Sequence, residues 1–373
     1  MRLESALNLR DELLEEVPGG SGLTAYAAGD YPSPDLIPSG ARDVPVVGDV
    51  INAAGSVVHA AATAVAVGVG VLVSPAVDLL THRGRLRHPA LGVAPAGAGD
   101  YRLAVRIPYE RLEHSPLVRR IRQAASDEVD VRVTGAISTR PPQLSDGHGF
   151  RARRRPVQIG YSVGHPQVTA GTIGCFVRTD EDSSLHLLSC NHVLADCGRG
   201  AVGDPILQPG RLDQGSEPDD AIGQLTYIEP LESTRPNTAD VALCRVDDAF
   251  APADPADLGT EGRLSGVAGL PRGDELVDKL GRTTRHTRGR VSAFGMRVPD
   301  IDYGDGLWIT LAEQIEIEGM ERSFSDGGDS GSLVYLSDSK EGFAILNAGD
   351  EYGYSFASPL PLVLTDLNLT LAR

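Results

Sequence analysis

A glycine-rich run near the C-terminal end constrains this chain most strongly. Residues 324–335 place Ser330 between Asp329 and Gly331, and an apolar, β-type segment follows directly. Glycine allows positive φ and close approach of another chain, so two backbone N–H groups can converge on one point. A polar turn before a strand uses the same residue types. The run is therefore a candidate nucleophile loop, and its interpretation depends on a base and an orienting group elsewhere.

The bulk composition limits the possible classes of function. The chain has 373 residues, 41% of them hydrophobic, and 25 prolines, which predicts a globular protein with many turns and room for two or three domains. Its formal net charge of −17 argues against a nucleic-acid-binding surface, which needs a basic face. The sequence contains no phosphate-binding loop, nucleotide fingerprint or metal-ligand cluster, so we expect no cofactor and no metal.

The cysteines and the N-terminus bear on the cellular compartment. None of the four cysteines has CxxC spacing, so a structural zinc site is not expected. The first residues lead into an acidic amphipathic stretch rather than a signal peptide. We therefore expect a cytoplasmic protein with free thiols. Cys175 and Cys190 lie on strands that could be neighbours, so they could pair in an oxidising compartment.

Residues 1–150 predict an N-terminal α/β region that regulates or targets the rest of the chain. A short helix is expected over residues 5–17, and strand-helix-strand patterns over residues 101–137 predict a small β-α-β unit. Pro116 must lie near the start of its helix or break it. Residues 138–156 are rich in Pro, Gly and Arg, so we interpret them as a solvated linker and as the best predicted domain boundary.

The segment from Val50 to Val77 contains no charged residue and is followed by several arginines. Its length would suffice for a membrane span with a cytoplasmic basic flank, so membrane association through residues 50–77 is the alternative localisation. A buried helical hairpin, or a helix plus a strand, is the other interpretation. Ala and Gly gain little from lipid compared with Leu, which favours the buried interpretation.

From residue 156 onward, many short apolar runs are separated by Gly, Pro and Asp, which predicts a β-barrel or sandwich. His192 follows an apolar run and is the candidate base. Asp240 precedes another apolar run and could orient that base. We interpret His186 as a surface or packing residue and His286 as structural.

Residues 156–373 resemble the chymotrypsin-like serine proteases, and within them the bacterial streptogrisin-type and plant narrow-leaf-type enzymes. The order of His, Asp and Ser along the chain is also the order of this fold. The resemblance rests on four blocks that match in order, which are Gly171–Gly174 with Ser189–Leu194, Ala239–Leu243, Leu280–Thr284 with Thr287–Val291, and Gly328–Ser332. It implies a mostly β chain, with a double β-barrel protease domain at residues 156–373 after the N-terminal α/β region.

The resemblance also implies a reaction and its residues. Ser330 would attack a peptide carbonyl and form an acyl-enzyme, with His192 as the base and Asp240 fixing the tautomer of His192. The N–H groups of Gly328 and Ser330 would form the oxyanion hole. Asp329 would be a structural carboxylate that shapes the loop. The expected partner is a protein or peptide substrate.

A substrate pocket follows from the same resemblance. Phe324 stands six residues before the nucleophile, where the family lines the base of the specificity pocket, and Ser325 is its neighbour. Asn347, Ala348 and Gly349 match the strand that would hold the peptide backbone. No acidic residue stands at position 324, so we expect a small or apolar side chain before the cleaved bond rather than Arg or Lys.

Two other classes of function stay open at this point. One is a catalytically silent, protease-fold binding or scaffold protein, in which the N-terminal region carries the function. The other is a membrane-acting protein whose segment at residues 50–77 is controlled by the protease domain. The sequence carries no signal for the oligomeric state.

Overall fold

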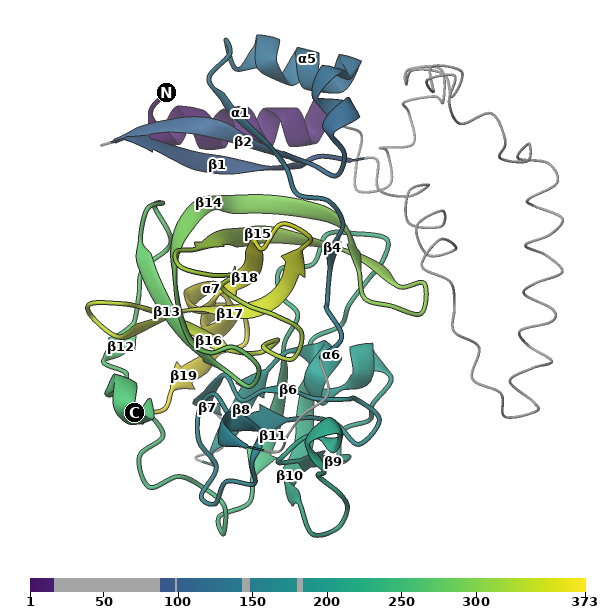
Figure 1. The fold of residues 1–373 in the computed structure, drawn as a ribbon, viewed down its shortest axis with the longest axis vertical. Helices are drawn as coiled ribbons and strands as arrows, with labels where there is room; N and C mark the ends of the chain where they lie inside the picture. Colours follow the sequence, from purple (N-terminus) through teal and green to yellow (C-terminus); the bar gives the residue numbers. More distant parts are fainter. Residues whose placement is uncertain (17–87, 98, 143–147, 180–183) are drawn as a thin grey trace, which may run out of the picture. The chain divides into compact units, whose positions relative to one another are not determined.

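The computed structural model describes residues 1–16, 88–97, 99–142, 148–179 and 184–373 (Figure 1). These described residues pack as one compact unit. The apolar segment at residues 50–77 lies outside the described ranges, and so does part of the predicted linker at residues 138–156. Within the described ranges, no helix is both long and apolar enough to cross a membrane.

The chain is mostly β, as predicted, and its first large sheet has six strands in the order β19-β7-β8-β11-β10-β9. Neighbouring strands in this sheet are antiparallel, and their apolar side chains form one buried core. A two-stranded sheet of β5 (Ser162–Val163) and β6 (Gly171–Thr172) lies before it in the chain. The six strands are β7 (Cys175–Thr179), β8 (His186–Ser189), β9 (Pro205–Leu207), β10 (Ala221–Ile228), β11 (Ala242–Val246) and β19 (Leu369–Leu371).

Six strands of the second large sheet close into a barrel. The pairings run β13-β16-β17-β18-β15-β14, and β14 pairs again with β13, so the circuit is complete. A second buried core lies among these strands. The strands are β13 (Leu276–Gly281), β14 (Arg285–Asp302), β15 (Trp308–Gly319), β16 (Leu333–Leu336), β17 (Glu341–Asp350) and β18 (Ser355–Pro359). Two short strands also pair with β17, namely β12 (Gly266–Val267) and β4 (Ile137–Ser138).

The N-terminal part contains the predicted β-α-β unit. Strands β2 (Asp100–Ile107) and β3 (Val129–Val133) are parallel, and a helix lies between them in the chain. The predicted helix is split into η4 (Glu110–His114) and α5 (Pro116–Ala124). Proline has no N–H and cannot continue a helix, but it fits the first helical turn. The preceding serine caps α5, since its hydroxyl accepts from Val118 N–H at 3.2 Å.

The N-terminal strands and the barrel form one continuous sheet at the joint between β1 and β14, and the sequence did not predict this. Strand β1 (Ala90–Gly97) pairs with β2 on one side and with β14 on the other, so the N-terminal strands extend the barrel sheet (Figure 1). Helix α1 (Leu3–Glu16) packs against β1 and β2. The N-terminal α/β region is thus built onto the edge of a barrel strand.

A buried ion pair lies at this joint. Arg106 on β2 contacts Glu316 on β15 through two hydrogen bonds of 2.6 and 2.9 Å, and both side chains are fully buried. Arg106 also lies 3.0 Å from Asp130 on β3. Burial acts to lower the pKa of the guanidinium, but the two carboxylates outweigh it, so the pKa of Arg106 is raised. One arginine therefore ties the N-terminal strands to the barrel.

The remaining helices are short. Helix α6 follows β8 directly, and α7 packs against β17, β18 and β19. Their bounds are α6 (Asn191–Leu194), α7 (Leu360–Asp366), η5 (Gly149–Arg151), η6 (Asp196–Gly198), η7 (Arg211–Asp213) and η8 (Gly259–Glu261).

Candidate active site

The pairing of β8 with β11 brings His192 and Asp240 together. His192 lies on α6 just after β8, and Asp240 lies just before β11. His192 Nδ1 is 2.5 Å from Asp240 Oδ2, and the His192 backbone N–H donates to Asp240 Oδ1 at 3.2 Å. An ionised carboxylate only accepts hydrogen bonds, so Nδ1 carries the proton and donates it. This tautomer leaves Nε2 of His192 as the basic atom.

Nε2 of His192 is buried and has no hydrogen-bond partner among the described residues. An unsatisfied buried acceptor costs about 1–3 kcal/mol, so proteins seldom keep one without a use. A proton donor that approached Nε2 would find a base already oriented by Asp240. This is the arrangement that a general base requires.

Tyr303 is a contact of Asp240 that the sequence did not reveal. It lies just after β14, and its hydroxyl donates to Asp240 Oδ2 at 2.9 Å. Its ring meets the His192 ring edge-on, with 5.7 Å between the centroids. Burial and the charge of Asp240 raise the pKa of Tyr303 well above its ordinary value, so the phenol keeps its proton and donates. Nothing in the turn around Tyr303 marks it as a partner of a distant aspartate.

Ser330 lies in the loop just before β16, and this loop packs against β6. Thr172 N–H donates to Ser330 O at 2.8 Å. A Cβ atom at Gly171 would lie 2.4 Å from the side chain of Val193 and 3.0 Å from Ser330 O. Ser330 O and the side chain of Val193, the residue after His192, therefore both lie close to Gly171.

Gly331 must be glycine for this packing. Its φ is +89°, a conformation that L side chains rarely adopt, and a Cβ atom there would lie 1.9 Å from Ser189 Oγ. The Gly331 N–H donates to Leu346 O at 2.8 Å, which ties the loop to β17. The glycine after Ser330 thus lets the loop lie directly against the end of β8.

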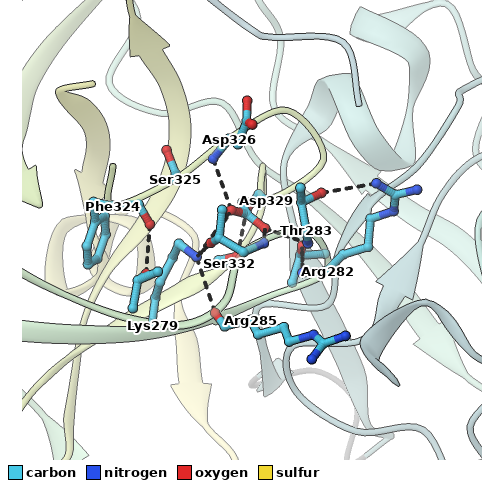
Figure 2. Close-up of polar contacts among 12 residues, drawn as sticks. Lys279, Arg282, Thr283, Arg285, Phe324, Ser325, Asp326, Asp329 and Ser332 are labelled. Carbon is cyan, nitrogen blue, oxygen red and sulfur yellow. Dashed lines mark hydrogen bonds and ion pairs between the residues drawn. The ribbon is translucent and has the colours of Figure 1, made fainter. Parts of the chain in front are cut away.

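Asp329 holds the Ser330 loop through several hydrogen bonds (Figure 2). Its Oδ1 accepts from the N–H groups of Thr283 and Thr284 at 2.8 and 3.1 Å. Its Oδ2 accepts from the Thr284 hydroxyl at 2.6 Å and from Asp326 N–H at 3.0 Å. Lys279 Nζ lies 3.2 Å from the same carboxylate, and both side chains are fully buried. Burial lowers the pKa of Lys279, and the Asp329 charge opposes that effect.

The predicted oxyanion hole consists of the N–H groups of Gly328 and Ser330 in this loop. Gly328 has a φ of +95°, and its carbonyl accepts from the Thr172 hydroxyl at 2.9 Å. Neither Gly328 N–H nor Ser330 N–H donates to a backbone carbonyl of a described residue. Fixed donors of this kind can stabilise charge that develops on a carbonyl oxygen.

A hollow lies beside Ser330. Three residues of the predicted substrate pocket line it, namely Ser325, Ala348 and Gly349. Four lining residues were not predicted as site residues, and two of these are charged: Asp326, from the Ser330 loop, and Arg140, from the stretch predicted as a linker. The full lining consists of Arg140, Ser325, Asp326, Gly327, Ser330, Leu346, Ala348 and Gly349.

Phe324 and Asn347 lie elsewhere than on this hollow. Phe324 is fully buried in the barrel core, and its carbonyl accepts from the Thr287 hydroxyl at 2.7 Å. The Asn347 amide donates to Gln314 at 2.8 Å and to Ser358 at 3.1 Å, so its side chain points away from the hollow. The prediction that Phe324 lines the substrate pocket was based on its position six residues before Ser330. It placed a core residue in the pocket, because spacing along the chain does not tell which way a loop side chain faces.

Cys190, His192 and Asp240 also offer three atoms within 4.8 Å of one another, a spacing that could hold a metal ion. The Cys190 thiol donates to Leu346 O at 3.1 Å, and burial raises its pKa well above its ordinary value. Metal binding needs a thiolate, so this donor set fits hydrogen bonding better than metal ligation. All four cysteines are free thiols.

Asp350, at the end of β17, gives a pH-dependent prediction. Burial raises the pKa of its carboxyl to about 7, against the opposing effect of two backbone N–H donors. The folded state therefore binds the proton more tightly than the unfolded chain, whose carboxyl has a pKa of about 3.9. Stability from this group is present at low pH and is lost as pH rises from about 4 to 7. Thermal unfolding of Asp350→Asn across this range should show a smaller decline than wild type.

Asp305 offers the matched control for that measurement. Its side chain is 79% exposed and pairs with Arg199 on the surface. Asp305→Asn should reproduce the wild-type pH profile. An Asp350→Asn profile that also matches wild type would contradict the assignment of the decline to Asp350.

The fold is similar to those of several solved bacterial proteases. The chymotrypsin of Cellulomonas bogoriensis is 16% identical, with a TM-score of 0.40, over 58% of this chain and 97% of that one. Protease A of Thermobifida fusca is 16% identical, with a TM-score of 0.41, over 58% and 98%. The Nocardiopsis protease is 15% identical, with a TM-score of 0.41, over 58% and 99%. No protein-family model matches the chain, and no curated protein sequence matches it. The chain is thus similar in structure to bacterial chymotrypsin-like serine proteases, at identities that do not assign an activity.

Proposed function

We propose that this chain is a serine endopeptidase that cleaves peptide bonds through an acyl-enzyme. Ser330 attacks the carbonyl carbon, and Nε2 of His192 accepts its proton. The proton then passes to the leaving amine as the peptide C–N bond breaks, which leaves the acyl group on Ser330. Water then attacks the acyl carbonyl while His192 takes its proton, the bond from the carbonyl carbon to Ser330 Oγ breaks, and the acid leaves as Ser330 takes that proton back. Asp240 keeps His192 in the tautomer that these transfers need.

One observation carries the proposal. The hydrogen bond from His192 Nδ1 to Asp240 fixes the ring and leaves Nε2 buried, with no partner in the described part of the chain. The next residue, Val193, lies close to Gly171, as Ser330 O does. The N–H groups of Gly328 and Ser330 would stabilise the tetrahedral oxyanion. Peptides and proteins are the substrates that this chemistry implies.

A second candidate function has specific support. Arg140 lines the hollow beside Ser330, and Nε2 of His192 makes no hydrogen bond to the Ser330 hydroxyl. Both observations fit a catalytically silent protein that keeps the protease fold for binding. Such a protein would still carry the His192–Asp240 contact but would not turn over a substrate.

The two functions differ in a burst experiment with an activated nitrophenyl ester of an amino acid. A peptidase with slow deacylation should release about one nitrophenolate per chain rapidly and then turn over slowly. Ser330→Ala should show neither phase. A wild-type trace that matches the Ser330→Ala trace would overturn the peptidase proposal and favour the silent one.

A further inference from the structure

A short strand from the predicted linker lies on the strand that was expected to hold a substrate backbone. In β4, Ser138 is the antiparallel partner of Gly349, and Ile137 is the partner of Asp350. On the other side, Thr139 N–H donates to Asp302 O at 3.0 Å. Residues 137–139 are thus held by main-chain contacts from both sides. The antiparallel pairing with β17 is the kind of main-chain contact by which an extended peptide adds to a strand, with side-chain pockets giving specificity.

The side chain of Arg140, two residues beyond Ser138, reaches the hollow. Arg140 lines the hollow together with Ser330. A Cβ atom at position 349 would lie 3.4 Å from the Arg140 guanidinium carbon, so the absence of a side chain at Gly349 makes room for this arginine. Arg140 therefore lies beside Ser330, the residue proposed to attack the peptide carbonyl.

The chain then passes over the loop that carries the candidate oxyanion hole. A Cβ atom at Gly327 would lie 2.1 Å from Pro141 O and 3.0 Å from Arg140 O. A Cβ atom at Gly328 would lie 2.9 Å from the ring of Pro142. The backbone around Arg140 is thus packed directly onto Gly327 and Gly328.

The charges around the hollow suit an arginine. Asp326 Oδ1 lies 4.0 Å from Arg140 Nη1. A half-exposed pair at this distance contributes little by itself, so it indicates a preference rather than strong binding. Asp350 is a second acidic group nearby, and its Oδ2 is buried without a hydrogen-bond partner among the described residues. The charge of Arg140 acts to lower the pKa of Asp350, so the two groups are close enough to interact.

We propose that residues 137–142 occupy the substrate cleft as an internal substrate mimic with Arg140 in the hollow beside Ser330, and that the cleft accepts polypeptides with arginine before the cleaved bond. This deepens the proposed function and rests on it. The preference differs from the small or apolar one expected from Phe324, because Phe324 lies in the core and Asp326 lines the hollow. A tethered segment competes at an effective concentration of about millimolar, so the intact chain should cleave free substrates weakly.

The test compares two peptide substrates that differ only in arginine or citrulline, its uncharged isostere, before the cleaved bond. Wild type should cleave the arginine peptide with a kcat/KM about tenfold or more above that of the citrulline peptide. Arg140→Ala removes the competing side chain, so KM for the arginine peptide should fall about tenfold or more while kcat is unchanged. Arg119→Ala is the matched control, since Arg119 is an exposed arginine on α5. It should behave as wild type.

A binding measurement gives a readout that does not depend on catalysis. A labelled peptide with the sequence of residues 137–142 should bind the double variant Ser330→Ala/Arg140→Ala, and its citrulline counterpart should bind at least tenfold more weakly. Equal binding of the two peptides, or an unchanged KM in Arg140→Ala, would overturn the inference. A nitrophenyl ester burst that persists in that case leaves the peptidase proposal standing. A different result would overturn only the peptidase proposal. In it, neither wild type nor Arg140→Ala shows a nitrophenolate burst, while the arginine peptide still binds more tightly than the citrulline peptide.

Discussion

Asp240→Asn is expected to lower the rate of ester and peptide hydrolysis about 10⁴-fold. Asp240 accepts from His192 Nδ1 at 2.5 Å, which keeps the proton on Nδ1 and leaves Nε2 free to act as a base. An asparagine amide can donate to Nδ1, which would move the ring proton to Nε2. The base would then be blocked although the size of the side chain is unchanged. Steady-state hydrolysis by the purified variant measures the effect.

Tyr303→Phe is the matched control for that variant. It removes the 2.9 Å hydrogen bond to Asp240 but keeps the carboxylate and the edge-on ring contact with His192. A hydrogen bond to a charged group contributes about 1.5–3 kcal/mol, so the rate should fall by about 10- to 100-fold. An Asp240→Asn rate within tenfold of wild type would contradict the role assigned to Asp240.

Arg106→Met is expected to lower the free energy of unfolding by about 3–5 kcal/mol. The substitution leaves Glu316 fully buried without its cation, and that carboxylate then keeps only local donors such as the Ser292 hydroxyl at 2.7 Å. Removing one partner of a buried pair costs more than the pair contributes, because the remaining charge is uncompensated. Urea unfolding can be followed with Trp308, the only tryptophan, which lies on the same strand as Glu316.

Arg132 provides the control on the neighbouring strand. Its side chain is 31% exposed and lies 3.1 Å from Asp130 and 3.6 Å from Glu318. Arg132→Met should cost no more than about 1 kcal/mol, as for other exposed pairs. The double variant Arg106→Met/Glu316→Leu should be more stable than Arg106→Met alone, because no buried charge is left. Equal losses for Arg106→Met and Arg132→Met would contradict a buried ion pair at the joint.

Local patterns in the sequence predicted local structure well. The alternation around residues 101–107 and 129–134 predicted two strands with a helix between them, and the structure has this β-α-β unit. The abundance of short apolar runs after residue 156 predicted the β-rich C-terminal part. These features depend on side-chain periodicity and turn residues, which are properties of neighbouring residues.

Long-range pairing could not be predicted in the same way. Nothing near β1 indicates that it pairs with β14, some 200 residues later, and no pattern marks Arg106 as the partner of Glu316. Residues 138–142 were interpreted as part of a solvated linker because they contain Arg and Pro, yet Arg140 lines the hollow beside Ser330. A two-residue strand such as β4 is too short for periodicity to reveal, and its register depends on a partner more than 200 residues away.

Covalent labelling tests the central claim, that Ser330 is a nucleophile activated by His192, most directly. The full chain is treated with a small fluorophosphonate, and the modified residue is located by mass spectrometry of its peptides. The account predicts one adduct, on Ser330, that is absent from Ser330→Ala and strongly reduced in His192→Ala. Arg140→Ala should label faster than wild type, because the hollow beside Ser330 is then less occupied. No adduct in wild type or in Arg140→Ala, or an adduct on a different serine, would contradict the account.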